Sequence, residues 1–295
     1  MGIRLENVCY TYGSDTTSEI KALNNVNLEI NKGEFVAIIG HTGSGKSTLI
    51  QHFNGLERPK SGNVFYNNEN IYENNYDLRK LRCKVGLVFQ YPEHQLFEET
   101  VLKDVCFGPM NMGMSREEAE KKAKLVLEQV GINEKCYNKS PFELSGGQKR
   151  RVAIAGVLAM NPEIIVLDEP TAGLDPKGRD KILNRIKELH DNTGIGVVLV
   201  SHSMEDVAKY AERLIVVNHG QIAFDDTPKK VFAHYKEMEP MGLAAPQITY
   251  IMHALKEKGL NVDPSDTTVE EAKQDILNAL RKMNSPLLKG GAQND

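Results

Sequence analysis

The pattern of apolar positions predicts strands and helices in alternation over most of the chain. Four uninterrupted apolar runs are typical of strands that are buried on both faces. These runs lie at residues 35–39, 85–89, 164–167 and 195–200, the last predicting a strand at 196–201. Helical spacing of apolar residues predicts helices over 46–54, from 145 onward, over 176–190 and over 203–211. This alternation indicates an α/β fold with a parallel sheet covered by helices on both faces.

Weaker patterns fill the intervening chain. Short strand-like patterns occur at residues 3–12, 26–30, 63–66 and 214–217 and around Ile222. Between residues 101 and 130, apolar residues recur at helical spacing instead. We therefore expect an N-terminal β part in front of the parallel sheet, and a helical arm within residues 91–160.

Beyond residue 240 the pattern becomes that of two amphipathic helices. Their apolar stripes consist of Ile248, Ile251, Met252 and Leu255, and of Val269, Ala272, Ile276 and Ala279. Thr268 and Glu271 are spaced as a capping box for the second helix. We predict a main domain at 1–238, a helical appendage at 239–288 and a polar tail at 289–295. Periodicity alone allows the appendage to be a lid on the main domain or a dimer contact.

Composition excludes several classes of protein. The apolar runs are all far shorter than the ~20 residues that a membrane helix needs. The N-terminus lacks the apolar core of a secretory signal, so a cytosolic location is expected. The four cysteines form no CxxC pair, which disfavours a zinc cluster and a disulfide scaffold. A formal charge of -4 disfavours a nucleic-acid partner.

A glycine-rich sequence directly follows the apolar run at 35–39. It begins with the pattern GxxxxGK[ST] and consists of Gly40, His41, Thr42, Gly43, Ser44, Gly45, Lys46, Ser47 and Thr48. In such a loop, backbone NH groups and a helix N-terminus bind phosphates, the lysine reaches the β- and γ-phosphates, and the serine hydroxyl can ligate magnesium. Between a strand and a helix, this pattern predicts an ATP and Mg²⁺ site; the alternative is an ordinary strand-to-helix turn.

Two carboxylates end the apolar run at 164–167. Asp168 and Glu169 would lie at the carboxyl end of a buried strand, where parallel sheets bind ligands. We predict that Asp168 serves the magnesium ion and that Glu169 orients or deprotonates the attacking water. The alternative is a capping acid at a strand-to-turn junction.

A second candidate anion site lies between these motifs. It consists of Leu144, Ser145, Gly146, Gly147 and Gln148. Ser145 is a good N-cap, and the two glycines expose backbone NH groups at the positive end of a helix. One nucleotide already has its phosphate site at 40–48, so this second site serves another ligand or completes a site on another subunit.

Taken together with Gln90, the segment 172–175 and His202, these motifs resemble an ABC-transporter nucleotide-binding subunit over about residues 3–235. The resemblance implies head-to-tail pairing of two cassettes, with ATP between one P-loop and the other cassette's LSGGQ. It further implies that Tyr12 stacks on adenine, Gln90 lies near magnesium, Asp175 forms the D-loop and His202 meets the γ-phosphate. Without it, Tyr12 is a strand-end aromatic, Gln90 a surface amide and His202 a helix cap.

A narrower resemblance is carried by the segments 89–101, 104–109, 245–249 and 255–259. They are similar to the ATPases of energy-coupling factor (ECF) transporters, importers of cobalt and vitamins, and most similar to the second of the two paralogous ATPases. That family implies a sister ATPase, a transmembrane coupling subunit and a membrane substrate-binding subunit. It also favours dimerisation for the appendage and a peripheral position on the cytoplasmic face of the membrane.

Three acids follow Gln90 in the segment that docks the coupling subunit in that family. We hypothesise that Glu93, Glu98 and Glu99 receive arginines from the coupling subunit, although a solvated charged face is the alternative.

The predicted function is an ATP-hydrolysing subunit of an ECF importer. Its predicted catalytic residues are Lys46, Glu169 and His202. The alternative is a soluble ABC ATPase that acts on DNA or ribosomes.

Overall fold

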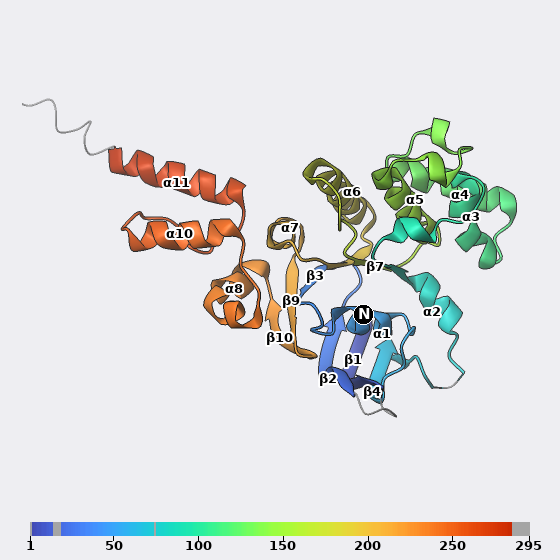
Figure 1. The fold of residues 1–295 in the computed structure, drawn as a ribbon, viewed down its shortest axis with the longest axis horizontal. Coiled ribbons are helices and arrows are strands. Elements are labelled where there is room, and N and C mark those ends of the chain that lie inside the picture. The colour runs from blue at the N-terminus through green and yellow to red at the C-terminus, as the bar shows by residue number, and fades with distance from the viewer. Residues whose placement is uncertain (1, 14–18, 74, 285–295) are drawn as a thin grey trace, which may run out of the picture.

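The computed structural model of the protein describes residues 2–13, 19–73 and 75–284 (Figure 1). The predicted tail at 289–295 and the last four predicted residues of the appendage, 285–288, lie outside this part of the chain. The body consists of two sheets with helices between and above them, and two C-terminal helices extend from its side.

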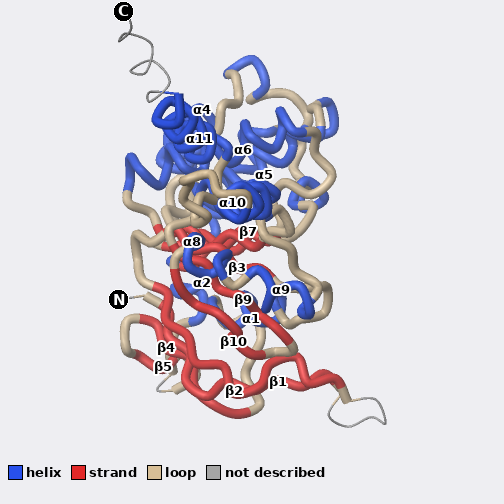
Figure 2. Tube along the Cα trace, turned by 90° about the vertical axis from the view of Figure 1, so that its left-hand side faces the viewer, coloured by secondary structure: helices blue, strands red, loops and turns tan. Residues whose placement is uncertain are grey.

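Two sheets form the layers seen in Figure 2. A four-stranded antiparallel sheet has the order β2-β1-β4-β5. Its strands are β1 (Ile3–Tyr12), β2 (Ile20–Ile30), β4 (Ser61–Tyr66) and β5 (Glu69–Asn70). A six-stranded sheet has the order β10-β9-β3-β8-β7-β6 and is parallel except for β10. Its strands are β3 (Phe35–Ile39), β6 (Val85–Val88), β7 (Ile164–Asp168), β8 (Gly196–Val200), β9 (Arg213–Asn218) and β10 (Gln221–Asp226).

The uninterrupted apolar runs are explained by burial on both faces of the six-stranded sheet. In β3, Phe35 packs against the helical side, whereas Val36 and Ile38 pack toward the antiparallel sheet. Helix α1 (Lys46–Phe53) lies in the second core, where Leu49 and Phe53 are buried with residues of both sheets. Helix α1 therefore lies between the two sheets, which together fix it and the loop in front of it.

The helical arm comprises α3 (Val101–Asn111), α4 (Arg116–Gln129) and α5 (Gly146–Leu158). The predicted helical region at 101–130 thus consists of two helices. They separate at Gly113, which has φ +88°, and Ser115 starts α4 with a complete capping box. The connecting 3-10 turns are η1 (Pro92–Gln95), η2 (Glu134–Cys136) and η3 (Pro141–Glu143).

The other helices are α2 (Leu78–Lys84), α6 (Pro176–Thr193), α7 (Met204–Tyr210), α8 (Pro228–Ala233), α9 (Tyr235–Met238), α10 (Gln247–Glu257) and α11 (Val269–Asn284), with a 3-10 turn η4 (Glu239–Met241). Helices α10 and α11 pack side by side around a small core of their own (Figure 1). The predicted capping box at Thr268 is only half formed. The Glu271 backbone NH donates to the Thr268 hydroxyl, but the Glu271 carboxylate accepts from Thr267 and pairs with Lys229 of α8.

All four cysteines are free, and Cys106 and Cys136 are buried. None of the helices in the described ranges has both the length and the apolar character of a membrane span.

A cluster of charges joins the two sheets at the start of β7. The Glu163 carboxylate pairs with Lys32, lies 2.9 Å from Lys84 Nζ and accepts a hydrogen bond of 2.9 Å from the Tyr66 hydroxyl of β4. Partial burial alone would raise the pKa of Glu163, but the hydrogen bonds from Lys32, Lys84 and Tyr66 outweigh it and lower the pKa to about 2.

We expect Glu163→Gln to lower the free energy of unfolding by about 1–2 kcal/mol at pH 7, because it removes charge-assisted hydrogen bonds. A carboxyl with a depressed folded pKa stabilises above its unfolded pKa, and this stabilisation is lost as the pH falls toward about 2. Urea titrations at several pH values measure this. The variant should lose less stability than the wild type between about pH 5 and pH 2; parallel losses would contradict the assignment.

Candidate functional site

The parallel sheet brings four predicted motifs to one edge. In the order β3, β8, β7, β6, the strands are followed by the glycine-rich loop, His202, the Asp168–Glu169 pair and Gln90. Parallel neighbours end at the same edge of a sheet, so segments that lie far apart in the sequence become adjacent. This edge is the candidate nucleotide site.

The loop between β3 and α1 has space only for glycine at two positions. A Cβ added at Gly40 would lie 2.4 Å from the Val217 carbonyl oxygen. Gly45 has φ +107°, and its Cβ would lie 2.3 Å from the Ala22 carbonyl oxygen. The loop therefore winds tightly against β9 and β2 and leads directly into the N-terminus of α1, where anions bind favourably.

The Lys46 side chain lies inside this loop. It is 7% exposed, and its Nζ donates to the carbonyl oxygens of Gly40, at 2.8 Å, and His41, at 3.0 Å. Burial lowers the pKa of Lys46, while the charges of Glu169 and Asp168 act in the opposite direction. Two carbonyl oxygens of the loop thus hold the ammonium, and a bound phosphate could replace them as its acceptor.

Asp168 and Ser47 supply oxygen ligands next to this lysine. The Ser47 hydroxyl lies near the buried Asp168 carboxylate and favours its charged form. Burial and the charge of Glu169 raise the pKa of Asp168, and Ser47 and Lys46 oppose that shift. A carboxylate and a hydroxyl in contact suit a hard cation such as Mg²⁺, which binds few protein ligands and completes its shell with phosphate and water.

Two side chains, from the ends of the strands on either side of β7, converge on Glu169. The Glu169 Oε2 accepts a hydrogen bond of 2.8 Å from Gln90 Nε2, and Oε1 lies 2.6 Å from His202 Nε2. Glu169 itself has φ +47°, a left-handed conformation that costs a non-glycine residue about 1–2 kcal/mol. The protein therefore fixes this carboxylate between an amide and an imidazole, beside Lys46 and Asp168.

Tyr12 lies beside Thr48, at the start of α1. It is 41% exposed at the end of β1, and its hydroxyl lies 3.1 Å from Thr48 Oγ1. The Tyr12 ring also makes an edge contact with Tyr10 at 4.9 Å. The ring is thus oriented next to the first turn of α1 and open to solvent, and its stacking on adenine stays a prediction.

The remaining loop residues hold its shape. Ser44 is buried, and its carbonyl accepts from Gly220 of the β9–β10 turn. His41 Nδ1 lies 2.8 Å from the Thr42 carbonyl oxygen, and Gly43 has φ +80° in open space.

Residues 144–148, called the signature segment from here on, form the start of α5, as their capping pattern predicts. Ser145 and Gln148 make a reciprocal capping box, and Leu144 is buried beneath it. A Cβ added to Gly146 or Gly147 would meet nothing within 4 Å. The N-terminus of this helix is therefore open toward solvent, and its role in a partner's site stays a prediction.

Asp175, the predicted D-loop residue, caps α6. Its carboxylate accepts from the Gly178 backbone NH at 2.6 Å. A contact with a partner subunit stays a prediction.

The three predicted docking acids have different surroundings. Both Glu93 oxygens accept hydrogen bonds from the buried Arg150, at 2.9 and 2.6 Å, so a docking role for Glu93 would require this pair to open. Glu99 is exposed and pairs with Lys103, and Glu98 is partly exposed. Sequence reasoning missed Arg150, although charged residues at 149–151 in an otherwise apolar helix were a signal.

Comparison with known proteins matches this geometry. Residues 23–172 match the ABC transporter family model. The energy-coupling factor transporter ATP-binding protein EcfA2 of Clostridium tetani is 55% identical, over 94% of this chain and 96% of its own length. EcfA2 of Streptococcus sanguinis is 51% identical over 93% and 99%. This chain belongs to the energy-coupling factor transporter ATP-binding protein family. As a member, it is an ABC ATPase.

Solved structures agree with this family. CbiO1 from Clostridium perfringens, described as part of the ABC transporter complex cbiONQ, is 39% identical with a TM-score of 0.72, over 85% of this chain and 98% of its own. A dimeric ATP-binding cassette in a post-hydrolysis state, bound to ADP and Pi, is 38% identical with a TM-score of 0.69, over 77% and 98%. The predicted ABC cassette fold is confirmed.

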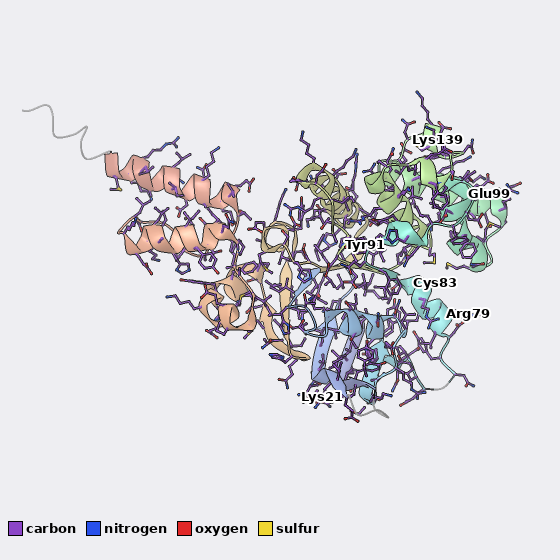
Figure 3. The ribbon with its side chains drawn as sticks, viewed as in Figure 1. Lys21, Arg79, Cys83, Tyr91, Glu99 and Lys139 are labelled. Atoms are coloured by element: carbon purple, nitrogen blue, oxygen red, sulfur yellow. The ribbon has the colours of Figure 1, made fainter. Side chains whose placement is uncertain are left out.

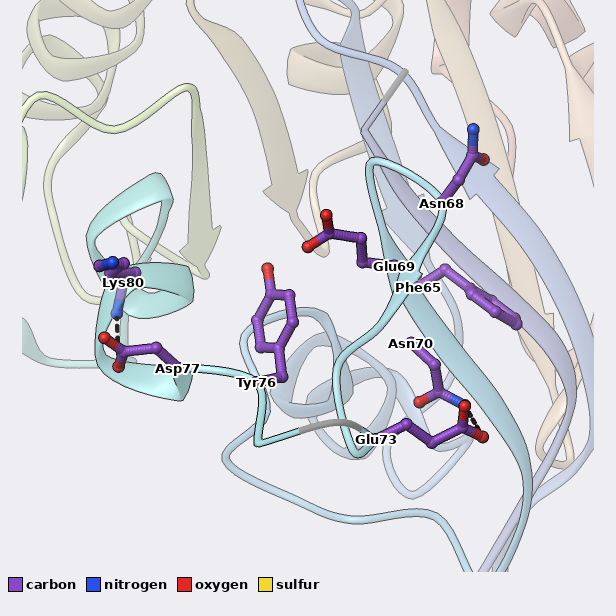
Figure 4. A pocket seen from close by; sticks show the side chains of 8 residues that line it. All are labelled: Phe65, Asn68, Glu69, Asn70, Glu73, Tyr76, Asp77 and Lys80. Atoms are coloured by element: carbon purple, nitrogen blue, oxygen red, sulfur yellow. Dashed lines mark hydrogen bonds between the residues drawn. The ribbon is translucent and has the colours of Figure 1, made fainter.

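An open cavity of about 690 Å³ lies elsewhere, between β4, β5 and α2 (Figure 4). It is lined by Phe65, Asn68, Glu69, Asn70, Glu73, Tyr76, Asp77 and Lys80, none of which belongs to the predicted nucleotide site.

We expect Lys46→Ala to weaken ATP binding at least about tenfold, because it removes the one ammonium inside the phosphate loop. Titration with a fluorescent ATP analogue measures the affinity. Lys181→Ala, on the exposed face of α6, is the control and should bind as the wild type does. Equal affinity of the Lys46 variant would remove this lysine from the site.

Proposed function

We propose that this chain is the ATP-binding and ATP-hydrolysing subunit of an ECF-type importer. The observation that carries the proposal is the convergence of Gln90 and His202 on Glu169, beside Lys46 and the glycine-rich loop. A fixed carboxylate beside a phosphate-binding loop is the arrangement that hydrolysis of a γ-phosphate needs.

In the proposed mechanism, each residue acts on charge or on water. Lys46 and the NH groups at the start of α1 bind the phosphates. Glu169 orients the attacking water and accepts its proton, and His202 donates a hydrogen bond to the γ-phosphate as negative charge develops there. Ser47, Asp168 and Gln90 would hold Mg²⁺, which neutralises charge on the phosphate oxygens when bound.

The signature segment completes a site on a partner ATPase in this proposal. Its glycines and Ser145 present open NH groups and a hydroxyl at the N-terminus of α5. A single nucleotide already has Lys46 and the loop of its own chain. The second phosphate-binding helix therefore favours a head-to-tail dimer, with a sister ATPase or with a second copy.

A groove supports docking to a membrane partner. It lies between α2, α3 and α5, has a volume of about 630 Å³ and includes the exposed Phe97 and Phe107, whose rings meet edge to face at 4.8 Å. Figure 3 shows Arg79 and Cys83 on α2, and Glu99 on the outer edge of the helical arm. An exposed aromatic pair in a groove suits a helix with apolar side chains from a coupling subunit. Docking there would place this chain peripherally on the cytoplasmic face.

The transported solute is a vitamin or a transition-metal ion in this proposal, and a separate membrane subunit binds it. The appendage of α10 and α11 presents exposed apolar residues, including Ile251, Leu277 and Leu280, which suits contact with a second ATPase. The alternative, a soluble ABC ATPase on DNA or ribosomes, has the net negative charge against it.

We expect the Glu169→Gln variant to bind ATP but to hydrolyse it at least about 100-fold more slowly than the wild type. The change keeps the shape of the side chain and removes the base. Tagged variant, purified with ATP from detergent-solubilised membranes of its own organism, should bring a homologous ATPase and two membrane proteins. Recovery of ribosomal or DNA-repair proteins instead would favour the alternative function. Wild-type turnover would contradict the role of Glu169.

We expect the double change Phe97→Ala, Phe107→Ala to reduce recovery of the membrane subunits about tenfold or more, because buried aromatic anchors dominate interfaces. ATPase activity of the isolated protein should stay within about twofold. Leu125→Ala, an exposed apolar residue on α4, is the control. A second variant with the charges of Glu98 and Glu99 reversed tests these acids independently of the aromatic pair. If it still assembles with the membrane subunits, the two acids do not belong to the docking surface.

A further inference from the structure

One buried guanidinium joins three segments of the site. Arg150 lies on α5 two residues after the signature segment and is 1% exposed. Its Nε and Nη2 donate to the two oxygens of Glu93, at 2.9 and 2.6 Å. Its Nη1 donates to the carbonyl oxygens of Pro170, at 3.1 Å, and Ala172, at 2.7 Å. Four hydrogen bonds therefore tie the signature helix to η1 and to the loop after β7.

The two segments that Arg150 holds are those that carry Gln90 and Glu169. Glu93 follows Gln90 by three residues, and Pro170 directly follows Glu169. The same two segments meet a second time where Gln90 donates to Glu169 at 2.8 Å. They are thus linked directly at the reacting end and, behind it, through Arg150 to α5.

The chemistry of this pair demands arginine. A planar guanidinium can make a two-pronged contact with a carboxylate and still reach two carbonyl oxygens, whereas lysine offers a single point charge. Burial alone would raise the pKa of Glu93, but the hydrogen bonds from Arg150 outweigh it, and the pKa lies below its usual value. The pair is therefore charged at neutral pH, and breaking it would leave a buried charge without a partner.

We propose that Arg150 is a positioning residue that couples the signature helix of a chain to Gln90 and Glu169 of the same chain. Of the two ATP sites in the dimer, one uses this chain's P-loop and the other uses its signature. Arg150 makes these two sites depend on one another. The inference rests on the proposed function in one respect, namely that the signature acts on the partner's nucleotide.

The test uses mixed dimers of this chain and its partner ATPase, purified through two different tags. In the first, the partner's catalytic glutamate is changed to glutamine, so that only the site with this chain's P-loop turns over. In the second, this chain carries Glu169→Gln, so that only the site completed by this chain's signature turns over. Hydrolysis of MgATP is measured in each with and without Arg150→Lys.

We expect Arg150→Lys to lower kcat about tenfold in both dimers, because a displaced catalytic group slows chemistry without removing phosphate contacts. KM for ATP should stay within about twofold in both. Loss confined to the second dimer would mean that Arg150 supports only its own helix, and it would overturn the coupling. Unchanged kcat in both dimers would overturn it as well.

One further variant serves as a substitute for Arg150→Lys and another as a control. If Arg150→Lys fails to fold, Glu93→Gln tests the same link with the side-chain shape retained, and it should lower kcat in both dimers about threefold. Glu120→Gln is the matched control, because it removes an exposed arginine pair in the same arm, at 3.0 Å from Arg116, and should change neither rate. Failure of the dimer without any change in either chain to hydrolyse MgATP would instead overturn the proposed function, and the inference with it.

Discussion

The site depends on parallel strands that end at one edge of the sheet. The order β3, β8, β7, β6 aligns four loops from distant parts of the sequence. Because these strands are buried on both faces, each strand is held by two cores and has little freedom to shift. The positions of the phosphate loop, His202, Glu169 and Gln90 relative to one another follow from that packing.

Side-chain pairs then refine what the sheet aligns. Glu169 holds an unfavourable left-handed backbone conformation, and contacts from both neighbouring strand ends offset its cost. Behind it, the buried Arg150 binds the Glu93 carboxylate and two carbonyl groups at once. Precise placement of a few polar groups thus rests on buried charges that are fully paired.

Three exposed surfaces have the chemistry of contact surfaces. The signature helix opens toward solvent, an aromatic pair lies in a groove beside α3, and α11 presents apolar residues without a covering element in the described part of the chain. A monomer gains nothing from these exposed apolar groups, whereas an assembly that buries them gains the hydrophobic contribution. The family to which the chain belongs is consistent with this.

Sequence alone predicted the six strands of the parallel sheet, the phosphate loop and the capped signature helix. These features depend on local periodicity, glycine conformation and capping, which act over a few residues. It did not determine the break at Gly113, which the helical spacing at 101–130 does not reveal, or the partner of Glu271.

Only the tertiary structure decided that Glu93 faces Arg150 rather than solvent. The two residues lie 57 positions apart in the sequence. The residues next to Glu93 in the sequence do not distinguish a buried partner of Arg150 from an exposed docking acid. Likewise, Gln90 and Glu169 lie 79 positions apart and meet only because β6 pairs with β7. A residue's own segment sets its chemistry, but strand pairing and burial choose its partner, and no local pattern in the sequence records that choice.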